Sequence, residues 1–414
     1  MKKIWLLLLF LLVIFNNVLE FNVPLGTFWD ELVVIIVIMV AIAKSGFKIK
    51  KKNLADWGLL LVVVVCGVVG NIINPTYQSE CAAIFKDILA ITKFFIVSFL
   101  LRDQSIGNRN DIKRSIVITS KILIVITVFA AFVGYFIDLS FYTGEIRIVK
   151  TFKFIYSHPT FFVSAYVILL SVMILDSIDK NRMFIILDCI LLFLAQRTKG
   201  YLIIIVAISL LILGEKKVQN LFSRFVMKEN RIKMSKKTYI LFGIIAIAGL
   251  IIGKDKINDY LGWGLTAARP ALYIVGIRLL VDNFPFGSGF GTFASSISGA
   301  YYSNVYAQYN ISMVSGLRID AHNYIADVFW PYVYGQLGVI GVIVYIVLLI
   351  RLVSKEMSIA FDFNSKIAIM FLFIYALIAS TSEAFFTNSS GVQYALFIGM
   401  FLAGNRRRDL YEQK

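Results

Sequence analysis

The chain has 414 residues, of which 59% are hydrophobic and 16% charged, and its mean hydropathy is +0.81. A soluble domain is about half apolar and about a quarter charged, so this composition excludes an ordinary soluble protein. The formal net charge of +16 could suggest nucleic-acid binding, but the Lys and Arg residues gather in short connections between apolar blocks, as in membrane proteins. The three cysteines are too scattered for a metal site or a disulfide framework. We therefore expect no nucleic acid, no metal and no cofactor.

Apolar blocks fill most of the chain, and a membrane-spanning helix needs roughly 20 apolar residues. The pattern predicts an all-α polytopic membrane protein of about twelve helices, with a single integral membrane domain over residues 1–414. The first block resembles a signal sequence, but no cleavage site of small residues follows it, so we expect a retained first span. The predicted spans lie at 4–19, 28–43, 54–73, 84–101, 116–137, 160–175, 183–196, 200–213, 239–252, 332–350, 366–381 and 391–404.

Lys and Arg residues mark every second connection, beginning with residues 44–52. The positive-inside rule then places both termini in the cytoplasm. The long connection 253–331 falls on the opposite side of the membrane. We expect this extracytoplasmic loop to be partly helical and to carry the chemistry, because it concentrates the unusual polar residues of the chain.

Several cations fall on the side that should be poor in positive charge, and a lipid-linked phosphate or pyrophosphate is a partner that would need them. Arginine suits phosphate because its guanidinium group can form two parallel hydrogen bonds. Arg269 precedes Pro270, so a helix should begin there with Arg269 at its N-terminus, where anions bind well. Arg278 should face the other side of this helix and pair with Asp282. Arg318 is either a phosphate ligand or a solvated surface charge.

The predicted spans 183–196 and 200–213 are short, so the turn between them should lie within the outer leaflet. This turn holds Arg197 and Lys199, and Thr198 can cap the helix that follows. The positive end of that helix points to the same place. Both cations are therefore candidate phosphate ligands. The alternative is that they extend to lipid headgroups.

The chain contains two histidines. His322 is a candidate general base because a neutral imidazole at pH 7 can take a proton from a hydroxyl, and Asp320 is a candidate to orient it. A structural histidine at the membrane surface is the alternative. His158 is interpreted as an interfacial residue. Two charges inside predicted spans, Lys93 and Asp188, either pair with each other or line a cavity, and we favour pairing over a function.

Glycine alternates with other small or aromatic residues in the segment 285–291. Glycine permits positive φ and a close approach of backbones, so Gly287, Gly289 and Gly291 could support a phosphate site. No strand precedes this run, and a tight turn anchored by its two phenylalanines explains the pattern equally well.

The order and spacing of these motifs resemble the O-antigen polymerase and O-antigen ligase superfamily (Wzy and WaaL types). About twelve spans with a large outer loop before the tenth also match. The motifs are the turn Gln196 to Gly200, the helix led by Arg269, the run Asn283 to Phe293, the segment Ala321-His322-Asn323-Tyr324 and the pair Gly338 and Gly341.

The resemblance implies a GT-C-like fold and a metal-independent, inverting glycosyltransferase in the bacterial cytoplasmic (inner) membrane. By resemblance, Arg197 and Arg269 would bind a pyrophosphate and His322 would activate the acceptor hydroxyl, with Asn323 and Tyr324 in support. Lys199 is an alternative to Arg197, because the family's Ser-Arg-Gly turn reads Arg-Thr-Lys-Gly here.

The implied partners are an undecaprenyl-pyrophosphate-linked oligosaccharide donor and acceptor, the lipid bilayer and a chain-length regulator. The expected function is polymerisation of repeat units into O-antigen or capsular polysaccharide, at the outer face of the membrane. A ligase that transfers the glycan to lipid A core or another acceptor is the alternative within the family. A flippase for lipid-linked oligosaccharides is the alternative from another class, although transporters gather polar residues near the midplane and often contain repeats.

Overall fold

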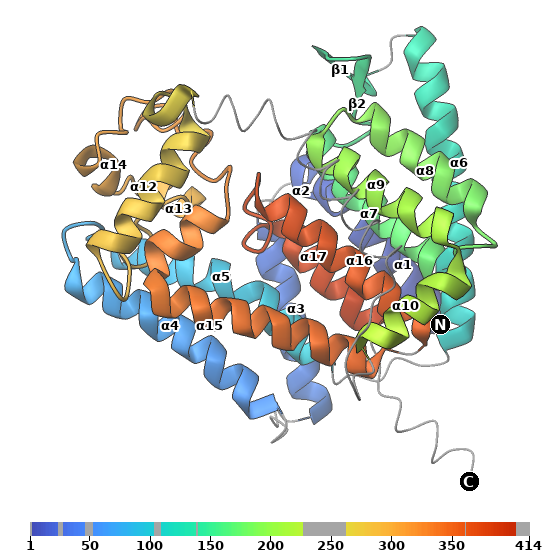
Figure 1. Cartoon of the computed structure of the whole chain (residues 1–414), viewed down its shortest axis with the longest axis horizontal. Coiled ribbons are helices and arrows are strands. Elements are labelled where there is room, and N and C mark those ends of the chain that lie inside the picture. The colour runs from blue at the N-terminus through green and yellow to red at the C-terminus, as the bar shows by residue number, and fades with distance from the viewer. Residues whose placement is uncertain are drawn as a thin grey trace.

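The computed structural model describes residues 2–23, 28–45, 53–102, 109–137, 140–226, 262–360 and 362–402. Within these ranges the chain is helical apart from a short hairpin and the connecting loops (Figure 1). Five of the described helices are long and apolar enough to cross a membrane, which confirms an all-α membrane protein. They are α4 (Leu54–Ile73), α6 (Arg109–Ile137), α7 (Pro159–Asp176), α15 (Trp330–Ile359) and α16 (Phe363–Ser380).

Shorter elements complete the architecture. α1 (Lys2–Ile14) and α2 (Asn16–Asn22) meet at a 70° bend and together cover the first predicted span. Helices also occupy ten of the other predicted spans, and the span predicted at 239–252 lies outside the described residues. The remaining described elements are α3 (Trp29–Ser45), α5 (Cys81–Arg102), β1 (Tyr142–Ile146), β2 (Lys150–Phe152), α8 (Arg182–Leu194), α9 (Thr198–Leu213), α10 (Glu215–Val226), η3 (Gly264–Thr266), α12 (Ala268–Asp282), α13 (Ser296–Ala300), α14 (Val305–Gln308), α17 (Ser389–Phe397) and η4 (Ile398–Leu402).

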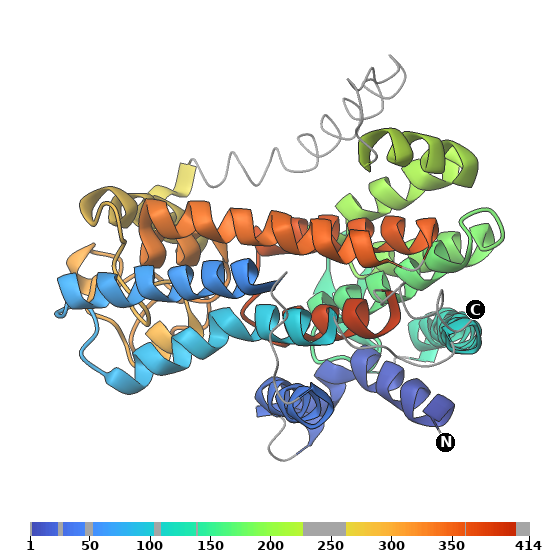
Figure 2. The same ribbon diagram turned by 90° about the horizontal axis from the view of Figure 1, so that it is seen from below.

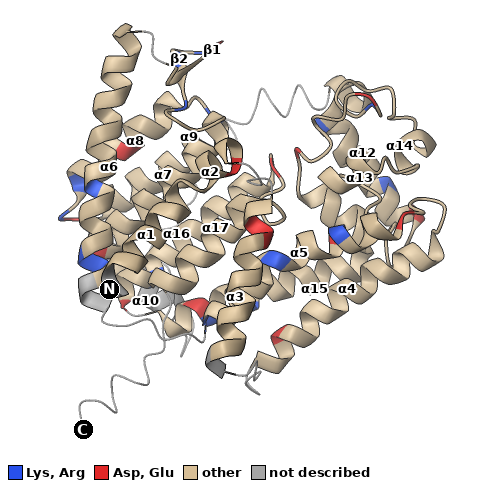
Figure 3. Cartoon of the chain, turned by 180° about the vertical axis from the view of Figure 1, so that it is seen from behind, with Lys and Arg blue, Asp and Glu red and all other residues tan. Residues whose placement is uncertain are grey.

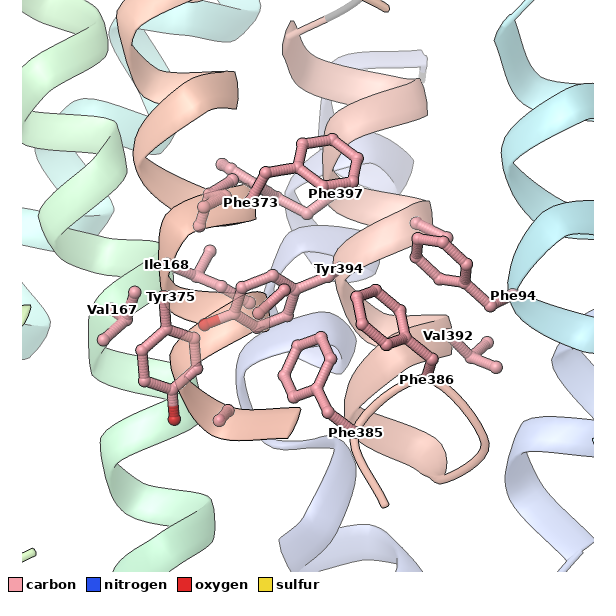
Figure 4. Packing of buried hydrophobic residues seen from close by; sticks show 14 of the residues in the cluster. Phe94, Val167, Ile168, Phe373, Tyr375, Phe385, Phe386, Val392, Tyr394 and Phe397 are labelled. Atoms are coloured by element: carbon pink, nitrogen blue, oxygen red, sulfur yellow. The ribbon is translucent and has the colours of Figure 1, made fainter. Parts of the chain in front are cut away.

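One part of the molecule is built around α7, which is buried along almost its whole length. A helix without a polar stripe is surrounded by other elements rather than lying on a surface. Its Val167 and Ile168 belong to one cluster of buried side chains with Tyr375 of α16 and Tyr394 of α17 (Figure 4). The Tyr394 hydroxyl donates to the carbonyl of Ser164 at 2.9 Å, so the packing also satisfies the polar end of a buried aromatic side chain.

Another part is built on α4 and α15, which lie side by side (Figures 1 and 2), and the glycine run is wedged against both. At Gly289, where φ is +93°, a Cβ atom would lie 2.4 Å from the backbone nitrogen of Asn71 in α4. At Gly338, where α15 departs from helical geometry, a Cβ atom would lie 2.3 Å from the carbonyl oxygen of Pro285. The Asn71 amide donates to the carbonyl of Phe290 at 2.9 Å and accepts from its N–H at 2.7 Å. The run therefore acts as a packing joint, as the tight-turn interpretation predicted.

At the other end of α4 and α15, a buried carboxylate joins three helices. Asp56 of α4 pairs with Arg102 of α5 at 3.1 Å and with Arg351 and Lys355 of α15 at 3.0 and 2.6 Å. Elsewhere, long stretches of helix carry neither sign of charge (Figure 3). Charged contacts of this kind can therefore fix the relative positions of otherwise apolar helices.

Candidate functional site

A cavity of about 740 Å³ opens where the turn between α8 and α9 faces the loops beyond α12. Its walls come from α2, α3, α5, α7, α9, α12, α13 and α17 and from the connections that adjoin them, so the two regions singled out in the sequence meet here. The charged and histidine residues that line it are Glu20, Asp30, Glu31, Asp87, Lys93, Arg147, His158, Arg197, Lys199, Arg269, Asp327 and Glu383.

Arg197 lies in this wall as the N-cap residue of α9, with an extended backbone. The sequence suggested Thr198 for the cap, but Thr198 is instead the first residue of the helix. Nη2 of Arg197 donates to Oε2 of Glu145 at 3.0 Å and lies 3.3 Å from Nε2 of His158. Its Nε is buried and has no hydrogen-bond partner within the described part of the chain. A guanidinium group has five N–H donors, so this one retains capacity for an anion.

The hairpin of β1 and β2 holds the turn that carries Arg197. Nη1 of Arg147 donates to the carbonyl of Gln196 at 3.1 Å, and the Gln196 side chain accepts from the N–H of Ile148 at 3.2 Å. Arg147 also pairs with Glu145 at 2.7 Å, so one carboxylate contacts both arginines. Gln196 has φ +52°, an uncommon value for a residue other than glycine, and these contacts stabilise it.

Lys199 is buried in the same wall and pairs with Glu383, from the connection between α16 and α17, at 2.6 Å. The side chains are 6% and 12% exposed. The ammonium group also lies 5.7 Å from the centre of the Tyr375 ring, which adds a favourable cation–π contact. Lys199 therefore links two parts of the bundle, and its charge is matched by a nearby carboxylate.

Arg269 is the second residue of α12, so the predicted helix start agrees with the structure to within one residue. Its Nε and Nη2 both donate to Oδ2 of Asp327, at 3.2 and 2.9 Å. Arg278 is exposed on the same helix and does not line the cavity. The predicted pair between Arg278 and Asp282 is wrong, because Asp282 instead accepts a hydrogen bond from the hydroxyl of Tyr309 at 2.8 Å.

A second group of lining residues consists mostly of carboxyl groups. Lys93 forms a buried ion pair with Asp30 and lies 3.8 Å from Glu31, and Glu20 accepts a hydrogen bond from α17 at 2.8 Å. The predicted pair between Lys93 and Asp188 is therefore wrong. α5 packs against α3 and α17, whereas α8 packs against α6, α7 and α9, and both carboxylate oxygens of Asp188 are buried without a hydrogen-bond partner among the residues described.

The predicted base lies beside the cavity rather than in its wall. Asn323 and Tyr324 line the cavity, but His322 does not. Its ring packs against Gly299, where a Cβ atom would lie 2.9 Å from the ring. Nδ1 lies 3.2 Å from the carbonyl oxygen of Ile319. If Nδ1 donates there, Nε2 is the proton-accepting nitrogen that a general base requires.

Other candidates from the long loop lie away from the cavity. Arg318 and Asp320 form an exposed ion pair at 2.9 Å, so Asp320 binds an arginine rather than His322. Gly287, Gly289 and Gly291 are buried in the joint between helices and do not line the cavity either. Of the loop residues proposed from the sequence, the structure brings Arg269, Asn323 and Tyr324 to the cavity.

His158 lines the cavity, although the sequence suggested only an interfacial role. Its Nδ1 accepts from the N–H of Thr160 at 3.2 Å and so caps α7. A polar residue before a proline at a helix start is a recognisable cap signal, but chain order does not reveal that this start lies beside Arg197. Further cavity-side residues that the sequence did not single out are Glu145, Asp327 and Glu383. Arg147 is one of the cations that the sequence placed on the outer side.

Positive groups are crowded at this end of the cavity. Burial lowers the pKa of Arg197, its carboxylate partner opposes that change, and Arg147 and Arg269 lower it further. Partial desolvation in the cavity wall, followed by Arg197 and Lys199, lowers the pKa of His158 below its usual value near 6.5, so the ring is neutral at pH 7. The cations Arg147, Arg197, Lys199 and Arg269 face the carboxylates Glu145, Asp327 and Glu383, which leaves this end net positive.

No family model and no curated protein matches the chain. The function must therefore be inferred from the cavity itself. It is lined by a cluster of arginines and a lysine and by a separate group of carboxylates, and these residues come from segments far apart in the sequence.

Proposed function

We propose that the chain is a metal-independent, inverting glycosyltransferase that polymerises undecaprenyl-pyrophosphate-linked repeat units into an O-antigen or capsular polysaccharide. The observation that carries the proposal is the meeting of Arg197 and Arg269 in one cavity wall. Both were candidate pyrophosphate ligands on sequence grounds, and their convergence supports a shared anionic ligand.

The cationic end of the cavity suits the leaving group of such a reaction. As the bond between the anomeric carbon and the phosphate oxygen breaks, its electron pair goes to the lipid pyrophosphate. Arg197, Arg269 and their neighbours are already in place to stabilise that developing charge. Each is held by a carboxylate, so little reorganisation of the protein is needed when the substrate binds.

The carboxylate-rich end suits the hydroxyl groups of a sugar. Glu20, Asp30 and Glu31 offer hydrogen-bond acceptors. The cation among them, Lys93, is already paired with Asp30. We assign this end to the acceptor glycan. Its hydroxyl oxygen attacks the anomeric carbon from the face opposite the pyrophosphate, which inverts the configuration.

The proton of that hydroxyl would pass to Nε2 of His322, the base implied by the family resemblance. His322 directly precedes the lining residues Asn323 and Tyr324 in the chain but does not itself line the cavity, so it would act after a local movement or through one water molecule. Catalytic hydrogen bonds often become short only in the substrate complex.

The proposal is tested by polymer formation in cells that carry Arg197→Ala or Arg269→Ala in place of the native chain. Removing one charge-stabilising donor typically lowers a rate by about a hundredfold or more, so we expect loss of long polymer and accumulation of single lipid-linked repeat units outside the cell. Arg278→Ala is the matched control, because Arg278 is exposed on the same helix as Arg269. It should give normal chain lengths.

Normal polymer in both cavity variants, at normal protein levels, would rule out the assignment of the arginines. A deletion strain distinguishes the alternatives. Repeat units held at the cytoplasmic face would indicate a flippase. Loss of transfer to lipid A core while polymer continues to form on the lipid carrier would indicate a ligase.

A further inference from the structure

The imidazole of His158 has an N–H donor directed at each of its two nitrogens. The backbone N–H of Thr160 lies 3.2 Å from Nδ1, and Nη2 of Arg197 lies 3.3 Å from Nε2. A neutral imidazole has one acceptor nitrogen and one N–H group. It can therefore satisfy only one of these donors.

The helix cap fixes which nitrogen keeps the lone pair. When Nδ1 accepts the N–H of Thr160, Nε2 carries the proton and faces Arg197, donor to donor. These nitrogens are 3.3 Å apart, so an acceptor that serves both N–H groups must lie to one side of the pair. Both residues line the cavity, and Nε of Arg197 is a further buried donor without a hydrogen-bond partner in the described residues. An anionic oxygen placed here would accept from more than one of these donors.

We propose that His158 is a ligand of the anionic group that Arg197 binds, and that its Nε2–H donates a hydrogen bond to a phosphate oxygen. The identification of that group as the pyrophosphate of a lipid carrier rests on the proposed function. The ring needs no reorientation, because the cap at Nδ1 already holds it. His158 thus performs two tasks, capping α7 through one nitrogen and binding the anion through the other.

Anion binding should also change the protonation of the ring. The charged groups that face it are Arg197 and Lys199 from the turn and Glu145 and Arg147 from the hairpin. In the empty cavity, desolvation and the cations lower the pKa of His158. Bound pyrophosphate adds negative charge beside the ring and raises that pKa again. A proton taken up on binding would go to Nδ1 and replace the hydrogen bond from Thr160, so the cap opposes this change. Proton uptake should therefore appear only as the pH falls from about 8 towards about 6.

Two substitutions separate the tasks of the two nitrogens. His158→Asn keeps an acceptor in the position of Nδ1, and Asn is a good N-cap residue, but it has no group in the position of Nε2. His158→Gln can place an amide N–H near the position of Nε2 but does not titrate. Both are studied in the full-length protein in phosphatidylcholine nanodiscs, by calorimetry with inorganic pyrophosphate and with farnesyl pyrophosphate, in buffers of different ionisation heat.

We expect His158→Asn to weaken binding of both ligands by about tenfold to a hundredfold, the usual effect of losing a hydrogen bond to a charged group, with an unchanged melting temperature. His158→Gln should bind more tightly than His158→Asn. Neither variant should show the proton uptake of the wild type. Wild-type affinity and proton uptake in His158→Asn would overturn the inference, and so would equal weakening in the two variants accompanied by a lower melting temperature.

Two further arms identify the anion and separate this inference from the proposed function. If phosphatidylglycerol in the nanodisc abolishes pyrophosphate binding, the site holds membrane headgroups and the inference is wrong as stated. If Arg197→Ala abolishes pyrophosphate binding while His158→Asn does not, only the role of His158 fails. If His158→Asn weakens binding but cells that carry Arg197→Ala still make normal polymer, the anion site stands and the polymerase function fails.

Discussion

At the scale of single residues, each cation in the cavity wall has a carboxylate beside it. The sequence singled out Arg197, Lys199 and Arg269 because cations are unexpected on the side of the membrane predicted to be extracytoplasmic. It could not reveal their partners, which come from other elements. The structure distinguishes Arg197 from Lys199. Arg197 keeps an N–H donor without a partner among the described residues, whereas Lys199 is buried against Glu383.

The pair of Lys199 and Glu383 gives a prediction that decides between a structural and a phosphate-binding lysine. Breaking a buried ion pair at one partner typically costs about 3–5 kcal/mol, because it leaves a buried charge unpaired. We expect Lys199→Gln or Glu383→Gln alone to lower the melting temperature and the polymer yield. The double variant should restore both, as measured by thermal unfolding of the purified protein and by polymer ladders.

The double variant can also contradict the structural role of Lys199. If Lys199 is needed to bind pyrophosphate, the protein with both substitutions should regain stability but make no polymer. Arg182→Ala serves as a control, since its ion pair with Asp179 is exposed, with 58% and 45% of the side chains accessible. Exposed pairs of this type contribute about 0–1 kcal/mol.

At the scale of elements, the sequence predicts which segments form helices but not which helices contact one another. Proline at the start of α12 and the apolar blocks at 54–73 and 332–350 predict where α12, α4 and α15 lie in the chain. The role of the glycine run depended on a contact over a long sequence distance, between Phe290 and Asn71. The sequence therefore left a phosphate loop and a tight turn open, and only packing could decide between them.

This joint predicts that Gly289→Ala is strongly destabilising. A residue other than glycine at φ +93° is strained by about 1–3 kcal/mol, and its Cβ atom would lie 2.4 Å from the backbone of α4. We expect a clear fall in melting temperature and in the yield of folded protein, measured by fluorescence-detected gel filtration. Gly58→Ala, in an exposed position of α4 with no atom within 4 Å of an added Cβ, should leave both unchanged.

A phosphate-binding glycine loop would behave differently. In that case Gly289→Ala would leave the melting temperature near the wild-type value while weakening pyrophosphate binding. Normal stability with lost binding would therefore contradict the packing role of the run.

At the scale of the whole molecule, the cavity is lined both by α12 with the loops that follow it and by the starts of α7 and α9. Charge bias along the chain predicts on which side of the membrane each connection lies. It predicted that the turn at Arg197 and the long loop share a side, and both line the same cavity, which agrees with that prediction. It could not show that His158 lines the cavity and His322 does not, because both lie in the predicted outer region and differ only in tertiary position.

The predicted sidedness can be tested with the three cysteines that the chain already contains. Cys66 and Cys189 are buried, whereas Cys81 is exposed at the start of α5. The connection before it is bonded to the long loop, since Asn304 donates to the carbonyl of Thr76 at 2.7 Å. If the positive-inside assignment holds, Cys81 faces the outside together with the cavity, and a membrane-impermeant maleimide should label it in intact spheroplasts.

Ser354→Cys in a Cys81→Ser background supplies the matched control for the opposite side. Ser354 is exposed on α15, between Arg351 and Lys355, in a connection predicted to be cytoplasmic. This variant should react only after the membrane is permeabilised. Labelling of Ser354→Cys in intact spheroplasts, together with no labelling of Cys81 in the unsubstituted chain, would reverse the topology. The cavity would then open towards the cytoplasm, where a polymerase could not meet repeat units that have crossed the membrane, so the proposed function would fail with the orientation.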